Sequence, residues 1–294
     1  CIRDRFQLQE RLDYIGRSLA LVAPLSIVLL SLGYLLTDSL IGAVTGQLIA
    51  YVAVFVAHDL AVARRRIALE PRTDSLRPSF RPDRLRPLFR LTVPLGLSAL
   101  LAVIAIEMPR VFVAAQLGTD SLGIFAPLFV LAMAPSRLVH SLGTAATTPL
   151  ATRHAAGDRS AFVALLSRLA LAAAAFVLVG VVIAATAGGW LLRTVYTADY
   201  ESHRDLFVVL VVAGALRFEA VLLQYGVIAA RKFWWLTANS AMVATVAVVT
   251  GWALVPNGLD EAGTAALVVF AVQLALTVIA VAWNLPKPAA ARSS

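Results

Sequence analysis

The 294-residue chain is 60% hydrophobic and only 14% charged, with a formal net charge of +8 and a mean hydropathy of +0.83. Soluble domains are about half apolar and about a quarter charged, so this composition excludes an ordinary soluble domain and predicts a polytopic membrane protein. The single cysteine, Cys1, excludes a disulfide framework and a thiolate metal site. The basic residues lie mostly in short segments between apolar runs, which favours membrane topology over nucleic-acid binding as their explanation.

Eight apolar runs have about the 20 residues that a helix needs to cross a bilayer. They are residues 18–36, 41–57, 91–108, 122–142, 161–187, 206–230, 236–255 and 263–283. Because these runs are continuously apolar rather than alternating, they predict helices and not a β-barrel. The expected fold is therefore an all-α, polytopic transmembrane helical bundle of about eight spans.

The segments between these runs alternate between arginine-rich and arginine-poor. The segment 58–90 is rich in arginine, whereas residues 37–39 and 256–262 contain no arginine or lysine. Basic loops mark the cytoplasmic side of a membrane, so both ends of this chain are expected in the cytoplasm. The bias toward arginine over lysine, with abundant alanine, indicates a bacterial protein, and the expected location is the cytoplasmic (inner) membrane.

The basic segment also supplies the predicted domain boundary. Residues 59–90 contain several prolines among the arginines, and proline disfavours one continuous helix. This segment is expected to be a cytoplasmic linker that lies near anionic lipid headgroups. The resulting division is the end of a first transmembrane lobe at 1–58, the linker at 59–90, a second six-helix lobe at 91–284 and a cytoplasmic tail at 285–294.

Arg217 lies in the middle of the apolar run 206–230, where a charge costs about 2.5–3.5 kcal/mol on insertion scales. Gln224 shares its helical face, whereas Glu219 lies about 200° round the helix, too far for the two charges to pair. Each is therefore expected to meet a partner on another helix. Two interpretations stay open, namely a polar lumen that holds Arg217 and Gln224, and a structural ion pair between helices.

The stretch 107–150 carries further charges within apolar sequence, around which the chain is organised. Glu107 and Arg110 are three residues apart and can pair near the outer end of their helix. Arg137 and His140 lie in the inner third of the next helix, where Arg137 can also extend toward the inner surface. The candidate substrate path consists of Arg217, Arg110, Glu219, Gln224, Glu107, Arg137 and His140.

Catalytic and cofactor motifs are missing from the sequence. It contains no Walker-type phosphate loop, no H-E-x-x-H, no Cys/His metal spacing and no G-x-S-x-G. The segments between spans are too short to form a large soluble domain. We therefore expect transport rather than catalysis, with no cofactor and no metal.

Short motifs along the sequence carry a family resemblance. In chain order they are Q9-E10-R11, H58-D59, P109-R110, L117-G118, L122 to A126, T148 to A151, A156-G157-D158, L191-L192, Y196, Y200, Y225-G226 and A230 to F233. In their order and spacing they resemble bacterial polysaccharide flippases, the O-antigen and exopolysaccharide translocases of the multidrug/oligosaccharidyl-lipid/polysaccharide exporter superfamily. The resemblance covers nearly the whole chain.

This resemblance implies a fold of about twelve spans in two six-helix lobes around a central cavity. The eight spans would then be helices five to twelve, with the first four missing from this chain. The family moves undecaprenyl-pyrophosphate-linked oligosaccharide from the inner to the outer leaflet, which implies that Arg110 and Arg217 lie on the substrate path, because guanidinium groups bind phosphates bidentately. The implied partners are the lipid-linked oligosaccharide, membrane lipids and a polysaccharide polymerase or glycosyltransferases, with no nucleic acid.

Other functions remain open on the sequence. The nearest are a multidrug exporter and a peptidoglycan-precursor flippase of the same superfamily. A polymerase of polysaccharide synthesis is a third, although such enzymes usually need a large extracytoplasmic loop or paired carboxylates. A membrane partner that does not itself transport is the fourth.

Overall fold

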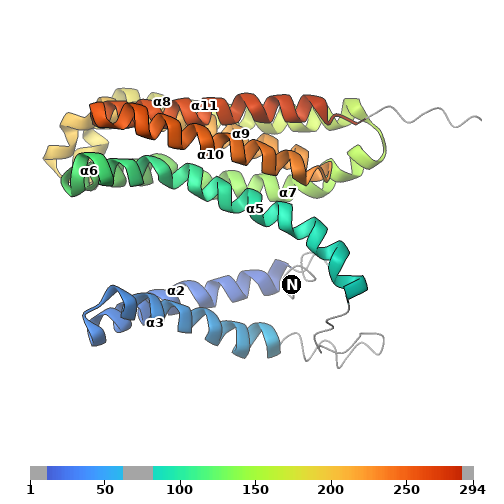
Figure 1. Ribbon diagram of the computed structural model, residues 1–294, viewed down its shortest axis with the longest axis horizontal. Helices are drawn as coiled ribbons and strands as arrows, with labels where there is room; N and C mark the ends of the chain where they lie inside the picture. The colour runs from blue at the N-terminus through green and yellow to red at the C-terminus, as the bar shows by residue number, and fades with distance from the viewer. Residues whose placement is uncertain (1–11, 62–81, 287–294) are drawn as a thin grey trace, which may run out of the picture. The chain divides into compact units, whose positions relative to one another are not determined.

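The computed structural model describes residues 12–61 and 82–286, and every regular element in these two stretches is a helix (Figure 1). The chain divides into two compact units, Cys1–Arg81 and Pro82–Ser294. The sequence expectation of an all-α polytopic bundle is thereby confirmed. The predicted domain boundaries themselves stay a prediction.

The first unit is a hairpin of two long helices. Its elements are α2 (Leu12–Thr37), α3 (Leu40–Val54) and the π-helical turn η1 (Phe55–Leu60). Glycines let the two backbones approach closely, because a Cβ atom at Gly33 would overlap the carbonyl oxygen of Gly42 and one at Gly46 would overlap that of Leu29. Small residues at a contact between helices are typical of membrane proteins, where close van der Waals packing replaces the hydrophobic effect.

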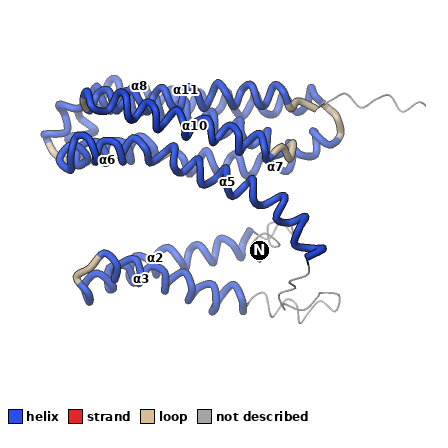
Figure 2. Tube along the Cα trace, viewed as in Figure 1, coloured by secondary structure: helices blue, strands red, loops and turns tan. Residues whose placement is uncertain are grey.

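The second unit is a helical bundle with short connections (Figure 2). Its elements are α5 (Pro82–Phe112), η2 (Val113–Leu117), α6 (Gly118–Met133), α7 (Ser136–Ala155), α8 (Arg159–Val195), η3 (Ala198–His203), α9 (Arg204–Ala229), α10 (Phe233–Leu254), η4 (Val255–Asn257) and α11 (Leu259–Trp283). Helix α9 is central, since half of its residues are buried and it packs against α7, α8 and α11. Helix α10 packs against α5 and α11.

Seven helical segments in the described stretches are long and apolar enough to cross a membrane. One of them, Thr92–Ala155, contains 64 residues. A straight helix of that length would measure about 96 Å, three times the roughly 30 Å of a bilayer core. The chain instead turns back at Gly118, whose φ of 87° is in the left-handed region that glycine tolerates (Figure 1). This segment therefore accounts for two of the eight expected spans.

Two expectations about helix boundaries need correction. Helix α5 begins at Pro82, nine residues before the expected span 91–108, so residues 82–90 of the predicted linker are helical. Proline is well tolerated at the first position of a helix, where its missing N–H would have no partner anyway. The predicted span 122–142 is divided at Ala134 and Pro135 into α6 and α7. The predicted linker residues 62–81, the N-terminal residues 1–11 and most of the tail, 287–294, lie outside the described part.

The interior of the second unit is built from apolar side chains of several helices. Phe125, Leu128 and Phe129 of α6 lie in one cluster with Leu210 of α9 and Phe270 of α11, all nearly inaccessible. Large apolar side chains also cover the outside of the bundle, including several valines and leucines of α8 and tryptophans at helix ends. An apolar exterior around a packed interior is what a lipid environment requires.

Candidate functional site

Arg217 occupies the middle of α9 and is buried, with 9% of its surface exposed. Its guanidinium carbon lies 5.5 Å from the centre of the Phe270 ring on α11. No ion pair joins Arg217 to a carboxylate in the part of the chain that the structure describes. A cation–π contact supplies about 0.5–2 kcal/mol, whereas a charge at mid-membrane costs about 2.5–3.5 kcal/mol, so the ring does not fully compensate the buried cation.

A small polar cluster lies between α7 and α9, about two helical turns along α9 from Arg217. The hydroxyl group of Tyr225 lies 3.1 Å from Nδ1 of His140 and 3.4 Å from Oγ1 of Thr144. The two rings meet edge to face, with centroids 6.4 Å apart. Gly143 makes room for this arrangement, because a Cβ atom there would overlap the Tyr225 ring. The charge of Arg217 is close enough to act electrostatically on His140.

Glu219 and Gln224 lie on the same helix as Arg217. Glu219 does not pair with Arg217, as the helical spacing predicts. Its Oε1 atom is buried and, among the described residues, has no hydrogen-bond partner. Both charged residues were expected to meet a partner on another helix. Arg217 meets the aromatic ring of Phe270 on α11, whereas Oε1 of Glu219 meets no hydrogen-bonding group among the described residues. Gln224 is half-buried.

The predicted pair Glu107–Arg110 is present on α5. Nη1 of Arg110 donates to Oε2 of Glu107 at 2.9 Å. The guanidinium carbon of Arg110 also lies 4.7 Å from the centre of the Phe129 ring, which belongs to α6. Arg110 therefore links α5 to α6, and its Nε atom is buried without a hydrogen-bond partner within the described stretches.

The structure divides the predicted path residues into two groups. One comprises Arg217 and His140 with their neighbours on α7, α9 and α11, and the other comprises Glu107 and Arg110 on α5. No hydrogen bond, ion pair or ring contact joins the two groups in residues 12–61 and 82–286. Arg137 lies in the first turn of α7, and its side chain is outside the described part.

The sequence analysis missed a second polar cluster, which is buried between α10 and α11. Nδ2 of Asn239 donates to Oγ1 of Thr277 at 3.0 Å, and Thr277 donates to the carbonyl oxygen of Gln273 at 2.7 Å. Oδ1 of Asn239 and Oε1 of Gln273 are buried without partners among the described residues. The available signal was an amide side chain within each apolar run, Asn239 near the start of one and Gln273 in the middle of the other.

The chemistry of the Arg217 group is that of anion recognition. It offers a buried guanidinium group on α9, together with the more exposed polar atoms of His140 and Tyr225. Hydrogen bonds to charged groups are about twice as strong as neutral ones, and a low local dielectric strengthens them further. Within the described stretches no group of three His, Cys, Asp or Glu side chains could hold a metal ion.

A bundle of membrane-spanning helices that buries an arginine without an ion-pair partner among the described residues, in the middle of its central helix, defines a polytopic membrane protein with a charged group in an otherwise apolar interior. The chain belongs to the polysaccharide biosynthesis protein family, whose model matches residues 6–154, just over half of its length. This match confirms the resemblance drawn from the motifs. The matched part includes Glu107, Arg110, Arg137 and His140, whereas α9 with Arg217 lies beyond it. No curated protein and no solved structure matches the chain.

Proposed function

We propose that this protein acts in a flippase that moves an undecaprenyl-pyrophosphate-linked oligosaccharide across the bacterial cytoplasmic membrane. Family membership supports a role in polysaccharide biosynthesis or export. The observation that carries the finer proposal is Arg217, a buried arginine at mid-span without an ion-pair partner in the described part of the chain. Such a residue is costly in a membrane and marks substrate pathways more often than chance would place it.

The pyrophosphate group accounts for the choice of arginine. Guanidinium presents a planar set of donors that matches two phosphate oxygens at once, which an ammonium group cannot do. A lipid-linked substrate brings its own anion into the membrane, and pairing with Arg217 would offset the cost of burying both charges. Tyr225 and His140 add hydrogen-bonding groups beside it for the remaining phosphate oxygens or the first sugar.

Alternating access is the proposed mechanism. The cationic group would hold the phosphates while the polyprenyl tail stays in the bilayer, and the lobes would open to either side in turn. We propose transport and not catalysis, with a polysaccharide polymerase or glycosyltransferases as partners of the pathway. The arginine distribution supports a cytoplasmic location for both ends of this chain.

Substitution of Arg217 in the full-length natural protein tests this proposal. Arg217→Ala should abolish export of the glycan at an unchanged level of protein in the membrane, and Arg217→Lys should retain part of it because the charge remains. Arg193→Ala is the matched control, since Arg193 is an exposed arginine in the last turn of α8. Normal export by Arg217→Ala would refute a role of Arg217 in binding the substrate.

One observation favours a second candidate, an exporter of cationic compounds. Glu219 has a buried carboxylate oxygen without a hydrogen-bond partner in the described stretches, and a cation could bind there. The two candidates differ in their response to Glu219→Gln. Loss of resistance to cationic drugs with intact glycan export would support this second function, and the reverse result would support the flippase.

A further inference from the structure

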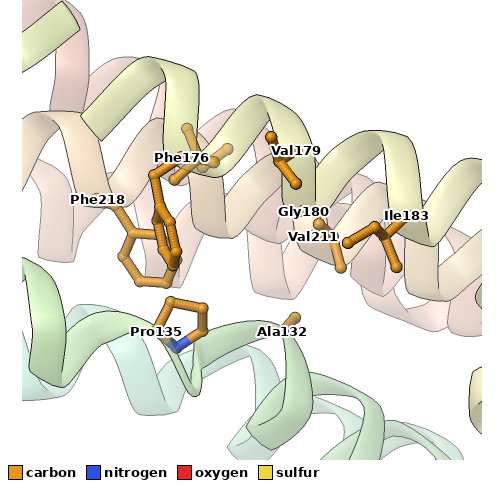
Figure 3. A pocket seen from close by; sticks show the side chains of 10 residues that line it. Ala132, Pro135, Phe176, Val179, Gly180, Ile183, Val211 and Phe218 are labelled. Carbon is orange, nitrogen blue, oxygen red and sulfur yellow. The ribbon is translucent and has the colours of Figure 1, made fainter. Parts of the chain in front are cut away.

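An apolar pocket opens on the side of the second unit, with a volume of about 190 Å³. It is lined by residues of α6, α8 and α9 and by Pro135, which lies between α6 and α7 (Figure 3); among them are Ala132, Phe176, Gly180, Val211 and Phe218. The pocket exists because two elements leave space. The helix is interrupted between α6 and α7 at Pro135. Gly180 on α8 has no side chain to fill the space beside it, and a Cβ atom built there would meet no other atom within 4 Å.

The position of the pocket decides what can fill it. Its residues lie near the middle of α8 and α9, both long enough to span a bilayer. Two of the side chains that line it are also exposed on the outside of the bundle, Val179 at 58% and Phe176 at 49%. A pocket without polar partners does not hold water, as apolar cavities of this size stay dry. Hydrocarbon chains of the surrounding lipid can therefore occupy the pocket. A volume of 190 Å³ holds about six groups the size of a water molecule, at roughly 30 Å³ each.

A cation lies where the headgroup of such a lipid would be. Arg168 is exposed on α8, and no hydrogen bond or ion pair engages its side chain in the described part of the chain. It precedes Val179 by eleven residues, which is about three helical turns and places both on the same face of α8. The separation along the helix is about 16 Å, close to the roughly 15 Å from the bilayer centre to the edge of its hydrocarbon core.

We propose that this pocket binds one acyl chain of an anionic phospholipid whose phosphate group pairs with Arg168. The site is separate from the proposed substrate path. On α9 the pocket is lined by Val211 and Phe218, whereas Arg217 turns away from it toward the Phe270 ring of α11. A lipid-linked substrate held at Arg217 would have to pass between packed helices to place its tail here, and a phospholipid reaches the pocket directly from the bilayer.

Photo-cross-linking of the whole chain tests the proposal. The protein is placed in vesicles of phosphatidylglycerol that contain a phosphatidylglycerol with a diazirine near the end of one acyl chain, and the labelled residues are mapped by mass spectrometry. Labelling should concentrate on the pocket residues of α8 and α9. Gly180→Leu should lose this preference because leucine fills the space. Gly96→Leu is the matched control, since a side chain at Gly96 also meets nothing within 4 Å but lies on α5, away from the pocket.

Two further variants complete the test. Arg168→Gln should lower the labelling in phosphatidylglycerol and leave it unchanged in phosphatidylcholine. Phe176→Ala enlarges the pocket and should raise labelling of Phe218, which keeps the proposal testable if Gly180→Leu fails to fold. Even labelling along the exposed face of α8, or labelling of the pocket that Gly180→Leu leaves unchanged, would overturn the proposal. Displacement by undecaprenyl phosphate but not by unlabelled phosphatidylglycerol would assign the pocket to the substrate chain instead and would also overturn it.

Discussion

The hydroxyl group of Tyr200 donates a hydrogen bond of 2.9 Å to the carbonyl oxygen of Gly123, the one carbonyl of α6 that Pro127 leaves without its helical donor. In an α-helix this carbonyl would accept from the N–H four residues later, which proline lacks. Tyr196, whose ring stacks on that of Tyr200 at 5.0 Å, donates to the carbonyl oxygen of Pro127 itself at 3.1 Å. Two tyrosines, one at the end of α8 and one in η3, thus bind the backbone of the proline-containing helix α6 at Gly123 and Pro127.

Tyr200→Phe should lower the free energy of unfolding by about 1 kcal/mol, because it removes one hydrogen bond and leaves the carbonyl oxygen of Gly123 without a donor. Thermal unfolding in detergent measures the effect. In a Pro127→Ala background the loss should largely disappear, since the substituted alanine supplies the missing N–H. Tyr196→Phe is the control, because its acceptor is not the orphaned carbonyl and its cost should be the same in both backgrounds. An equal cost of Tyr200→Phe in both backgrounds would contradict this account.

Gly143→Ala should displace Tyr225 and separate its hydroxyl group from His140. The added methyl group would overlap the tyrosine ring, and overpacking of this kind costs about 1–3 kcal/mol. Thermal unfolding and tyrosine fluorescence would report the change. Gly96→Ala should leave stability nearly unchanged, as its methyl group meets open space. A variant at Gly143 that is as stable as the one at Gly96 would show that α7 and α9 do not pack as described.

Arg217→Leu should raise the free energy of unfolding by about 1–3 kcal/mol while it abolishes export. A buried charge without an ion-pair partner is destabilising, and an apolar side chain removes that cost. Arg110→Leu should instead lower the free energy of unfolding, since it breaks the ion pair with Glu107 and the contact with the Phe129 ring. The two variants are compared by unfolding in the same detergent. A loss of stability in Arg217→Leu would indicate a structural role for this arginine.

Asp158 should make the start of α8 sensitive to acid. Its carboxylate accepts from the N–H of Ala161 and from the hydroxyl group of Ser160, both at 2.9 Å, and the first of these bonds is the main reason why its pKa is lowered. A lowered pKa in the folded state means that the stabilisation is present above the ordinary aspartate pKa and is lost as the pH falls through the folded value. The protection of the Ala161 amide against hydrogen exchange, measured relative to the intrinsic exchange rate at each pH, should therefore fall as the pH is lowered through this range. Asp158→Asn should remove most of this pH dependence while keeping an acceptor for the cap.

The helices were predictable because a helix that crosses a bilayer needs about 20 mostly apolar residues in a row. The apolar runs are helical in the structure, including the run around Arg217, where the apolar residues offset the charge, although the run 122–142 is divided at Ala134 and Pro135 between α6 and α7. The pairing of Glu107 with Arg110 followed from their spacing on one helix. The turn at Gly118 followed from a polar, glycine-containing sequence between two apolar runs.

Contacts between helices were not predictable in the same way. Nothing in the local sequence indicates that Tyr225 meets His140, 85 residues earlier, or that the hydroxyl group of Thr237 donates to the carbonyl oxygen of Pro94. Asn239 and Thr277 were not predicted to meet because an amide or hydroxyl group in an apolar run indicates that it needs a partner but not which helix supplies it. The start of α5 at Pro82 was not predicted because the expected span was bounded by its apolar residues alone, although proline is favourable at the first position of a helix.

The helix interruption at Pro135 separates α6 from α7, and different hydrogen bonds hold these two helices in place. On one side α6 is fixed by Tyr196 and Tyr200, and on the other α7 is fixed to α9 through His140 and Tyr225. A bend at the break would change the angle between α6 and α7 and leave both sets of hydrogen bonds intact. Since Pro135 also lines the apolar pocket, the same bend would change the pocket's volume, so the stiffness of this helix pair would depend on the lipid that surrounds it.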